Sequence, residues 1–272
     1  MLAFPNCKIN LGLHILGKRE DGFHNLETIF YPVPFRDALE IIPDPNNKSQ
    51  IEFTGTGLAV DGNPEDNLCV KAYHLLKKDI PELPSIKIHL HKALPLGAGL
   101  GGGSADAAFM LKMLNEKFRL NLSTSQLINY SLRLGSDCPF FIINKPCFAT
   151  GRGEMLEEIQ VDLYAYKIVL VNPGIHIHTS WAFSNITPGL PARSIKEIIQ
   201  QPVDTWKEGL KNDFEEPVFT AHPAIKEIKE KLYAQGALYA SMSGSGSTVF
   251  GIFSSAGNLA AQFPADHFVK VI

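Results

Sequence analysis

The sequence has no excess of positive charge and no long apolar run. Its 272 residues carry 25 Lys and Arg against 28 Asp and Glu, which gives a formal net charge of −3. That balance provides no basic surface for nucleic acid or for an anionic membrane. No stretch approaches the ~20 apolar residues of a membrane span, and the first residues lack the pattern of a secretion signal. We expect a cytoplasmic protein that binds neither nucleic acid nor membrane.

Cysteine is scarce, and no Cys-x-x-Cys pair is present. Scattered cysteines of this kind are typical of reduced thiols in a cytoplasmic protein. Histidines alternate in two strand-like segments, at His89 and His91 and at His176 and His178. Each pair has a chelating spacing but no third ligand in sequence reach, so a zinc site is disfavoured. The four cysteines are Cys7, Cys69, Cys138 and Cys147.

Three common nucleotide-binding signatures are also missing. Gly103 is followed by Ser104 and Ala105, without the Gly-Lys-Ser/Thr ending of a Walker loop, and no His-Arg-Asp or Asp-Phe-Gly occurs. Gly-x-Gly-x-x-Gly at residues 97–102 matches the dinucleotide pattern. However, residues 92–95 separate it from the preceding predicted strand, and no acid follows at the required distance of ~20 residues.

The chain does contain a glycine-rich stretch that runs directly into a helix-forming sequence. Glycines let the backbone approach a ligand closely, and the first amides of the following helix point toward an anion. This pattern favours a phosphate cradle over the alternative, a tight strand-to-helix turn. The expected phosphate-binding residues are Pro95, Leu96, Gly97, Ala98, Gly99, Leu100, Gly101, Gly102, Gly103, Ser104 and Ala105.

Two polar positions outside this stretch are candidates for chemistry. Lys8 and Asn10 alternate on one face of a predicted strand, although such a pair is also typical of a solvated edge. Asp137 directly precedes an apolar segment, although an Asp beside Pro139 is commonly a turn residue that bonds its own backbone. Neither position identifies an activity by itself.

Together these segments resemble the galactokinase, homoserine kinase, mevalonate kinase and phosphomevalonate kinase superfamily, the GHMP kinases. The resemblance spans nearly the whole chain in the expected order. Each motif is modestly specific, and the second and third together single out one branch of the superfamily. The five motifs lie at residues 8–11, 19–24, 95–104, 135–141 and 243–251.

The resemblance implies an α+β, two-domain GHMP kinase fold. Residues 1–160 would form an N-terminal ATP-binding domain like domain 2 of ribosomal protein S5, and residues 161–272 a C-terminal ferredoxin-like α/β domain. ATP is implied as co-substrate, and Mg²⁺ is expected with it. Gly102 and Gly103 stand where other members have two serines, so no residue is assigned to the metal.

The branch in question phosphorylates the 2-hydroxyl of 4-(cytidine 5′-diphospho)-2-C-methyl-D-erythritol. The resemblance implies Lys8 and Asp137 as catalytic residues, with Asp137 accepting or orienting the hydroxyl proton. Phe23 replaces a common Tyr, so a phenolic hydroxyl is lost there. The alternatives are a GHMP kinase for homoserine or a sugar, and a non-catalytic nucleotide-binding module. The implied substrate-binding residues are Asn10, Phe23, His24, Thr179 and Phe183.

Periodicity and turn signals predict the secondary structure. A capping-box pattern at Ser123 and Gln126 marks one helix start. A turn is expected at residues 44–48. The predicted strands are 7–15, 27–34, 38–42, 50–55, 86–91, 140–143, 147–150, 166–172, 238–242 and 248–253. The predicted helices are 67–78, 104–117, 123–134, 206–213 and 224–235.

Overall fold

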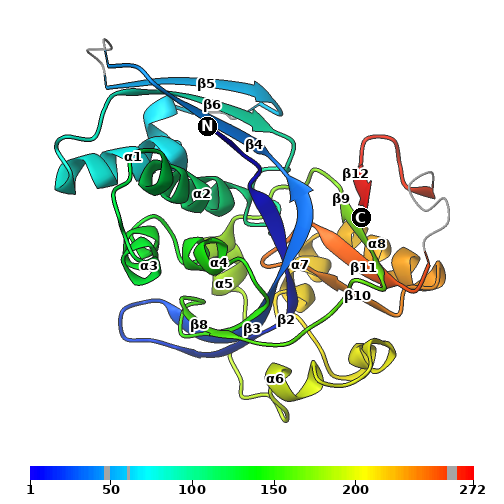
Figure 1. Cartoon of the computed structure of the whole chain (residues 1–272). Coiled ribbons are helices and arrows are strands. Elements are labelled where there is room, and N and C mark those ends of the chain that lie inside the picture. Colours follow the sequence, from blue (N-terminus) through cyan, green and yellow to red (C-terminus); the bar gives the residue numbers. More distant parts are fainter. Residues whose placement is uncertain (46–49, 60–61, 256–261) are drawn as a thin grey trace. The chain divides into compact units, whose positions relative to one another are not determined.

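The chain folds into two compact units, each built from several segments. The computed structural model describes residues 1–45, 50–59, 62–255 and 262–272 (Figure 1). The first unit comprises Met1–Cys7, Pro34–Leu96 and Gly101–Lys145, and the second comprises Lys8–Val33, Gly97–Leu100 and Pro146–Ile272. The predicted domain boundary after residue 160 stays a prediction. The turn expected at 44–48 lies partly outside the described residues.

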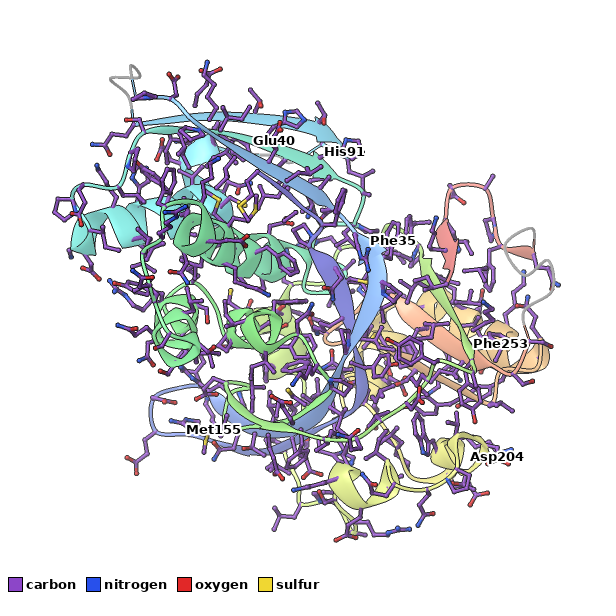
Figure 2. The ribbon with its side chains drawn as sticks, in the orientation of Figure 1. Phe35, Glu40, His91, Met155, Asp204 and Phe253 are labelled. Carbon is purple, nitrogen blue, oxygen red and sulfur yellow. The ribbon has the colours of Figure 1, made fainter. Side chains whose placement is uncertain are left out.

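The first unit contains a four-stranded sheet in the order β1-β4-β6-β5. Only β5 and β6 pair in parallel among its described strands. Helices α1 and α2 cover one face (Figure 1), while Glu40 and His91 lie on the other (Figure 2). The strands are β1 (Leu2–Ala3), β4 (Ala38–Pro43), β6 (Ile86–Lys92) and β5 (Ile51–Gly57).

The helices of this unit follow their sequence signals with one exception. The capping box is confirmed, because Gln126 N donates to Ser123 Oγ at 3.3 Å and Ser123 N donates to Gln126 Oε1 at 2.9 Å. The strand predicted at 140–143 is wrong, since a helix begins at Cys138 with Pro139 in its first turn. The helices are η1 (Pro64–Asp66), α1 (Leu68–Asp79), α2 (Gly102–Lys117), α3 (Thr124–Leu132) and α4 (Cys138–Ile143).

The first sheet of the second unit has the order β2-β3-β7-β8. Its two long strands continue into the first unit at one end. β2 is buried on both faces from Asn6 to Ile15, so the solvated-edge alternative for Lys8 and Asn10 is wrong. The strands are β2 (Asn6–Lys18), β3 (His24–Arg36), β7 (Cys147–Thr150) and β8 (Met155–Glu158).

The second sheet of this unit is antiparallel, in the order β10-β11-β9-β12. α7 and α8 lie against it (Figure 1), and their apolar side chains Val218, Ile225 and Leu232 join its core. Gly236 follows α8 with φ +93°, as expected of a C-terminal cap. The strands are β10 (Tyr239–Met242), β11 (Val249–Phe253), β9 (Lys167–Asn172) and β12 (Phe268–Val271).

The remaining helices of the second unit are short. The helix predicted at 206–213 is instead the 3₁₀ helix η2, which ends before Gly209. In the part of the chain that the structure describes, no helix combines the length and apolarity needed to cross a bilayer. The bounds are α5 (Thr179–Ser184), α6 (Ile195–Ile198), η2 (Val203–Glu208), α7 (Glu215–Ala221) and α8 (Pro223–Ala234).

Candidate active site

The glycine-rich loop has alternating left-handed residues and then enters α2. Gly97, Gly99 and Gly101 have φ values of +60°, +77° and +70°, which only glycine adopts without strain. Gly101 caps α2 and has no side chain to accept a bond from its first amides. The first turn of a helix leaves such donors without intrahelical acceptors. The local backbone therefore has the form of an anion cradle.

The middle of this loop is fixed within the second unit. Gly99 lies so close to a neighbouring turn that an added Cβ would be 1.9 Å from Ser243 O. Ser243 Oγ donates to Gly99 O at 2.8 Å, and Thr248 N donates to Ala98 O at 3.2 Å. Lys8 N donates to Leu100 O at 2.9 Å. The loop thus contacts both the β2 strand and the C-terminal glycine motif.

Lys8 and Asn10 form a buried pair on β2. Their exposed fractions are 3% and 1%, and Lys8 Nζ donates to Asn10 Oδ1 at 2.5 Å. The ammonium also lies 5.1 Å from the ring centroid of Phe30. Asn10 N donates to Ser243 Oγ at 3.3 Å, while Asn10 Nδ2 donates to Thr28 Oγ1 at 2.9 Å. A buried ammonium therefore lies in the same unit as residues 97–100 of the loop and the C-terminal glycine motif.

The C-terminal glycine motif is shaped by two asparagines that sequence reasoning missed. Asn212 Nδ2 donates to Met242 O at 2.7 Å and Gly244 O at 2.9 Å. Asn172 Nδ2 donates to Ser247 Oγ at 3.1 Å and to Thr248 Oγ1 at 3.0 Å. Each asparagine is distant in sequence from the residues that it bonds, so no local sequence pattern could have revealed these hydrogen bonds.

Two candidate substrate-binding residues come from α5. Thr179 Oγ1 lies 3.1 Å from Ser245 Oγ of the glycine motif. The Phe183 ring is stacked on His24, with centroids 4.9 Å apart. Burial, together with Lys18, lowers the pKa of His24, so the neutral ring offers one donor and one acceptor. Phe23 is 51% exposed, with the Arg152 guanidinium 4.8 Å from its ring centroid.

Asp137 belongs to the first unit, whereas Lys8 belongs to the second. Asp137 is half-buried immediately before α4 and makes no side-chain cap bond to that helix. The neighbouring thiol of Cys138 is buried, and burial raises its pKa to about 12. The pairing of Asp137 with Lys8 stays a prediction.

The histidine pairs do not assemble a metal site. His89 and His91 lie on β6 and hydrogen-bond Thr54 and Thr56 of β5, with separations of 2.8 to 3.1 Å. Across the described ranges, no three His, Cys, Asp or Glu side chains are grouped so as to hold an ion.

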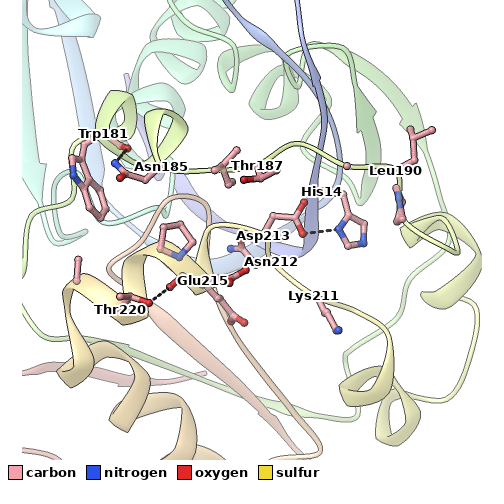
Figure 3. Close-up of a pocket in the computed structure, with 16 residues that line it drawn as sticks. His14, Trp181, Asn185, Thr187, Leu190, Lys211, Asn212, Asp213, Glu215 and Thr220 are labelled. Carbon is pink, nitrogen blue, oxygen red and sulfur yellow. Dashed lines mark hydrogen bonds and ion pairs between the residues drawn. The ribbon is translucent and has the colours of Figure 1, made fainter.

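A cavity of about 770 Å³ lies elsewhere in the second unit (Figure 3). Lys211 and Trp181 line it, and His14 Nδ1 is 3.0 Å from Asp213 Oδ1 in its wall. None of the residues that the sequence assigns to the site lines this cavity. The glycine turns and the Lys8–Asn10 pair, rather than this cavity, define the candidate site.

Comparison with known families agrees with the fold. Residues 67–145 match the GHMP kinases N terminal domain, and residues 194–270 match the GHMP kinases C terminal domain. A crystal structure of homoserine kinase from Cytophaga hutchinsonii superposes with a TM-score of 0.71 over 99% of this chain and 93% of its own, at 14% identity. That likeness shows the fold alone. The chain is a GHMP kinase, a class that uses ATP as co-substrate.

Closer relatives define the branch. The 4-diphosphocytidyl-2-C-methyl-D-erythritol kinase of Bacteroides thetaiotaomicron is 56% identical over 95% of this chain and 94% of its own. That of Cytophaga hutchinsonii is 49% identical over 94% and 93%. A crystal structure of 4-(cytidine 5′-diphospho)-2C-methyl-D-erythritol kinase gives a TM-score of 0.80 at 30% identity, covering 93% and 90%. The chain belongs to the 4-diphosphocytidyl-2-C-methyl-D-erythritol kinase family.

Proposed function

We propose that this kinase transfers the γ-phosphoryl group of ATP to the 2-hydroxyl of 4-(cytidine 5′-diphospho)-2-C-methyl-D-erythritol. This reaction belongs to the non-mevalonate route to isoprenoid precursors. The observation that carries the proposal is the contact of both glycine turns with the buried Lys8–Asn10 pair. Phosphoryl transfer requires an aligned hydroxyl and stabilised phosphate charge. The glycine turns and the Lys8 ammonium can stabilise the phosphate charge.

The glycine-rich loop would hold the ATP phosphates through backbone amides at the start of α2. The Lys8 ammonium would stabilise negative charge that develops on the transferred group, and burial strengthens such an interaction. Asn10 would orient either the acceptor or a phosphate through its amide. Asp137 would accept or orient the proton of the acceptor hydroxyl, so that an oxygen lone pair faces the phosphorus.

Mg²⁺ is expected to accompany ATP and to neutralise phosphate charge. The described carboxylates and imidazoles form no cluster of three that would hold an ion. Magnesium commonly binds through substrate phosphates with one or two protein carboxylates.

The acceptor's cytosine would be recognised by the turn between β2 and β3 together with α5. Phe183 offers an aromatic face, and neutral His24 can pair with a polar base edge through one donor and one acceptor. Thr179 would contact the diphosphate or the methylerythritol beside Ser245. Phe23 provides an exposed ring. These roles distinguish a cytidine-linked acceptor from a small polar alcohol.

A coupled assay tests the proposal directly. The purified chain is incubated with ATP, Mg²⁺ and the cytidine diphosphate acceptor, and ADP formation is followed while ³¹P NMR identifies the product. Homoserine and mevalonate serve as comparison acceptors and should give no ADP above background. CDP should compete with the acceptor. Turnover of homoserine or mevalonate in preference, or CDP competition against ATP alone, would overturn the assignment.

A further inference from the structure

Three buried charged side chains lie beside the two ends of the glycine-rich loop, within the first unit. Lys92, the last residue of β6, is 2% exposed. Its ammonium donates to Asp37 and to Asp106, at 2.8 Å from Asp106 Oδ2. Asp37 lies between β3 and β4, and Asp106 lies in the second turn of α2. We call Asp37, Lys92 and Asp106 the loop-base triad.

The triad fixes the backbone that leads into the loop. Asp37 Oδ1 accepts bonds from the amides of Ala93 at 2.7 Å and Leu94 at 2.9 Å. The same carboxylate binds the Lys92 ammonium through its other oxygen. Hydrogen bonds to an ionised acceptor are about twice as strong as neutral ones. The two residues before Pro95 are therefore held by a single buried side chain.

Lys92 also contacts the helix that follows the loop. Besides its bond to Asp106, its Nζ lies 3.3 Å from the point where a Cβ on Gly102 would stand. The ammonium thus lies directly beneath the first turn of α2. Residues 95–101 connect the segment before Pro95 to the start of α2, and the Lys92 ammonium links these two ends of the loop. Fixing the ends of a loop reduces the conformational freedom that ligand binding must otherwise remove.

We propose that Asp106 is a positioning residue that acts through Lys92. It holds the first turn of α2 against the segment before Pro95 and so preforms the cradle for the ATP phosphates. The inference rests on the proposed function, because it takes ATP to be the ligand of this loop. Asp106 itself would not contact ATP. Its effect should appear in ATP affinity, with the acceptor site unaffected.

The charge state of the triad gives the proposal a second readout. Burial raises the pKa of Asp106 to about 7, where Lys92 opposes and Asp37 reinforces the shift. Asp106 Oδ1 has no hydrogen-bond partner among the described residues. Burial lowers the pKa of Lys92, but Asp106 and Asp37 outweigh it and leave that pKa raised. Of these two groups, Asp106 is therefore the one that changes charge near neutral pH.

Among the described residues, the thiol of Cys69 on α1 is an ionisable group that also faces the triad. Burial raises its pKa well above the ordinary value, so it stays neutral across the useful pH range. The charged contact between Lys92 and Asp106 therefore forms as pH rises through about 7 and is lost as Asp106 takes up a proton at lower pH. Asp106→Asn mimics the protonated state in size and shape.

Calorimetry with ATP tests the proposal on purified full-length variants. At pH 8, Asp106→Asn should raise the Kd for ATP about three- to tenfold, the scale of one lost charged contact. Asp106→Ala and Lys92→Met should raise it about tenfold or more. Lys112→Met is the matched control, because Lys112 lies on the same helix over the ring of Phe109. The control should leave the Kd within about twofold of wild type.

The pH dependence separates positioning from a general loss of structure. ATP phosphates titrate near pH 6, so the informative quantity is the Kd of Asp106→Asn divided by that of wild type at each pH. That ratio should fall toward one between pH 8 and pH 6. Amide hydrogen exchange of residues 95–104 should be faster in the Asn variant without ATP. Affinity for the cytidine diphosphate acceptor should be unchanged.

Several results would overturn the proposal. An unchanged ATP Kd in Asp106→Ala, an equal loss of acceptor affinity, tighter ATP binding by the Asn variant at pH 8, or a ratio independent of pH would each do so. If the wild-type chain binds no ATP, the proposed function has failed. In that case, loop exchange that is unchanged in Asp106→Asn contradicts the positioning role, and faster exchange supports it.

Discussion

The imidazole of His24 lies nearly parallel to the phenyl ring of Phe183, with ring centroids 4.9 Å apart and planes inclined by 18°. Phe214 meets Phe183 edge-on, also at a centroid distance of 4.9 Å. A third ring between two stacked rings needs about 7 Å, twice the contact distance of carbon atoms. A cytosine that stacks on the face of Phe183 that His24 covers must therefore displace His24, and the displaced imidazole could then pair with the base edge.

The first prediction concerns this aromatic pair. Phe183→Ala should weaken acceptor binding by about 5- to 150-fold, because base stacking on one ring is worth about 1–3 kcal/mol. His24→Ala should cost a similar factor through lost pairing. Titration calorimetry with the acceptor measures both, and ATP affinity serves as the internal control. Equal acceptor affinity in wild type and Phe183→Ala would remove the ring from the base site.

A second prediction concerns the proposed catalytic pair. Asp137→Asn and Lys8→Met should each lower turnover by about 10²-fold or more, the scale of lost acid–base or electrostatic assistance. The Michaelis constants should change less than kcat. Steady-state kinetics with both substrates provides the measurement. Turnover close to wild type in either variant would exclude that residue from the mechanism.

The glycine-rich loop gives a third prediction, in which position matters. A Cβ on Gly103 would have only Leu68 Cδ1 nearby, at 3.7 Å. Gly103→Val should therefore fold normally and affect only the binding of ATP. Steric crowding of about 1–3 kcal/mol should raise the Michaelis constant for ATP by about 5- to 150-fold.

Gly99→Ala is the contrasting variant. Its Cβ would meet Ser243 O at 1.9 Å, so it should lower the melting temperature as well as the ATP affinity. If ATP binds Gly103→Val with wild-type affinity, the loop is only a turn between strand and helix.

The fourth prediction links Asp106 to stability. Its pKa is about 7 in the folded chain and 3.8 as an ordinary value, so between these pH values the folded state binds the extra proton. This group's contribution to stability is therefore present below pH 4 and is lost as pH rises toward 7. Asp106→Asn should be more stable than wild type at pH 8 by about 1 kcal/mol or more.

Thermal unfolding of both proteins at pH 5 and pH 8 measures the effect. The difference in melting temperature between variant and wild type should be larger at pH 8. A difference of the same size at both pH values would mean that Asp106 does not titrate between pH 5 and pH 8. Together with weaker ATP binding, a more stable variant would mean that the ionised carboxylate is retained for function at a cost to the fold.

Local signals explain what the sequence could predict. The β2–β3 hairpin, the start of α2 after the glycines and the Ser123 capping box each depend on residues close in sequence. The apolar run at residues 138–143 has no such signal, because a short buried segment carries no distinguishing period. Pro139 in the first helical turn was the available indication of a helix. The short helix α5 was also missed.

In the candidate site, too, local motifs were predictable from the sequence and long-range contacts were not. Motifs identified Lys8, Asn10 and the glycine turns, while the bonds that shape them join residues far apart. Lys92 and Asp37 are separated by 55 positions, and Asn212 and Gly244 by 32. Such partners depend on tertiary packing, which periodicity and turn chemistry do not encode.

The interleaving of the two units bears on how the chain folds as it leaves the ribosome. Residues 8–33 emerge early, but their sheet partners β7 and β8 and the Leu13–Asn212 bridge come from residues beyond 146. The apolar β2 strand cannot be fully buried until these partners have been synthesised. Contacts this distant in sequence slow folding and favour intermediates. A nascent chain of about 150 residues should therefore expose β2 to chaperones, and fragments cut near residue 160 should be insoluble when expressed separately.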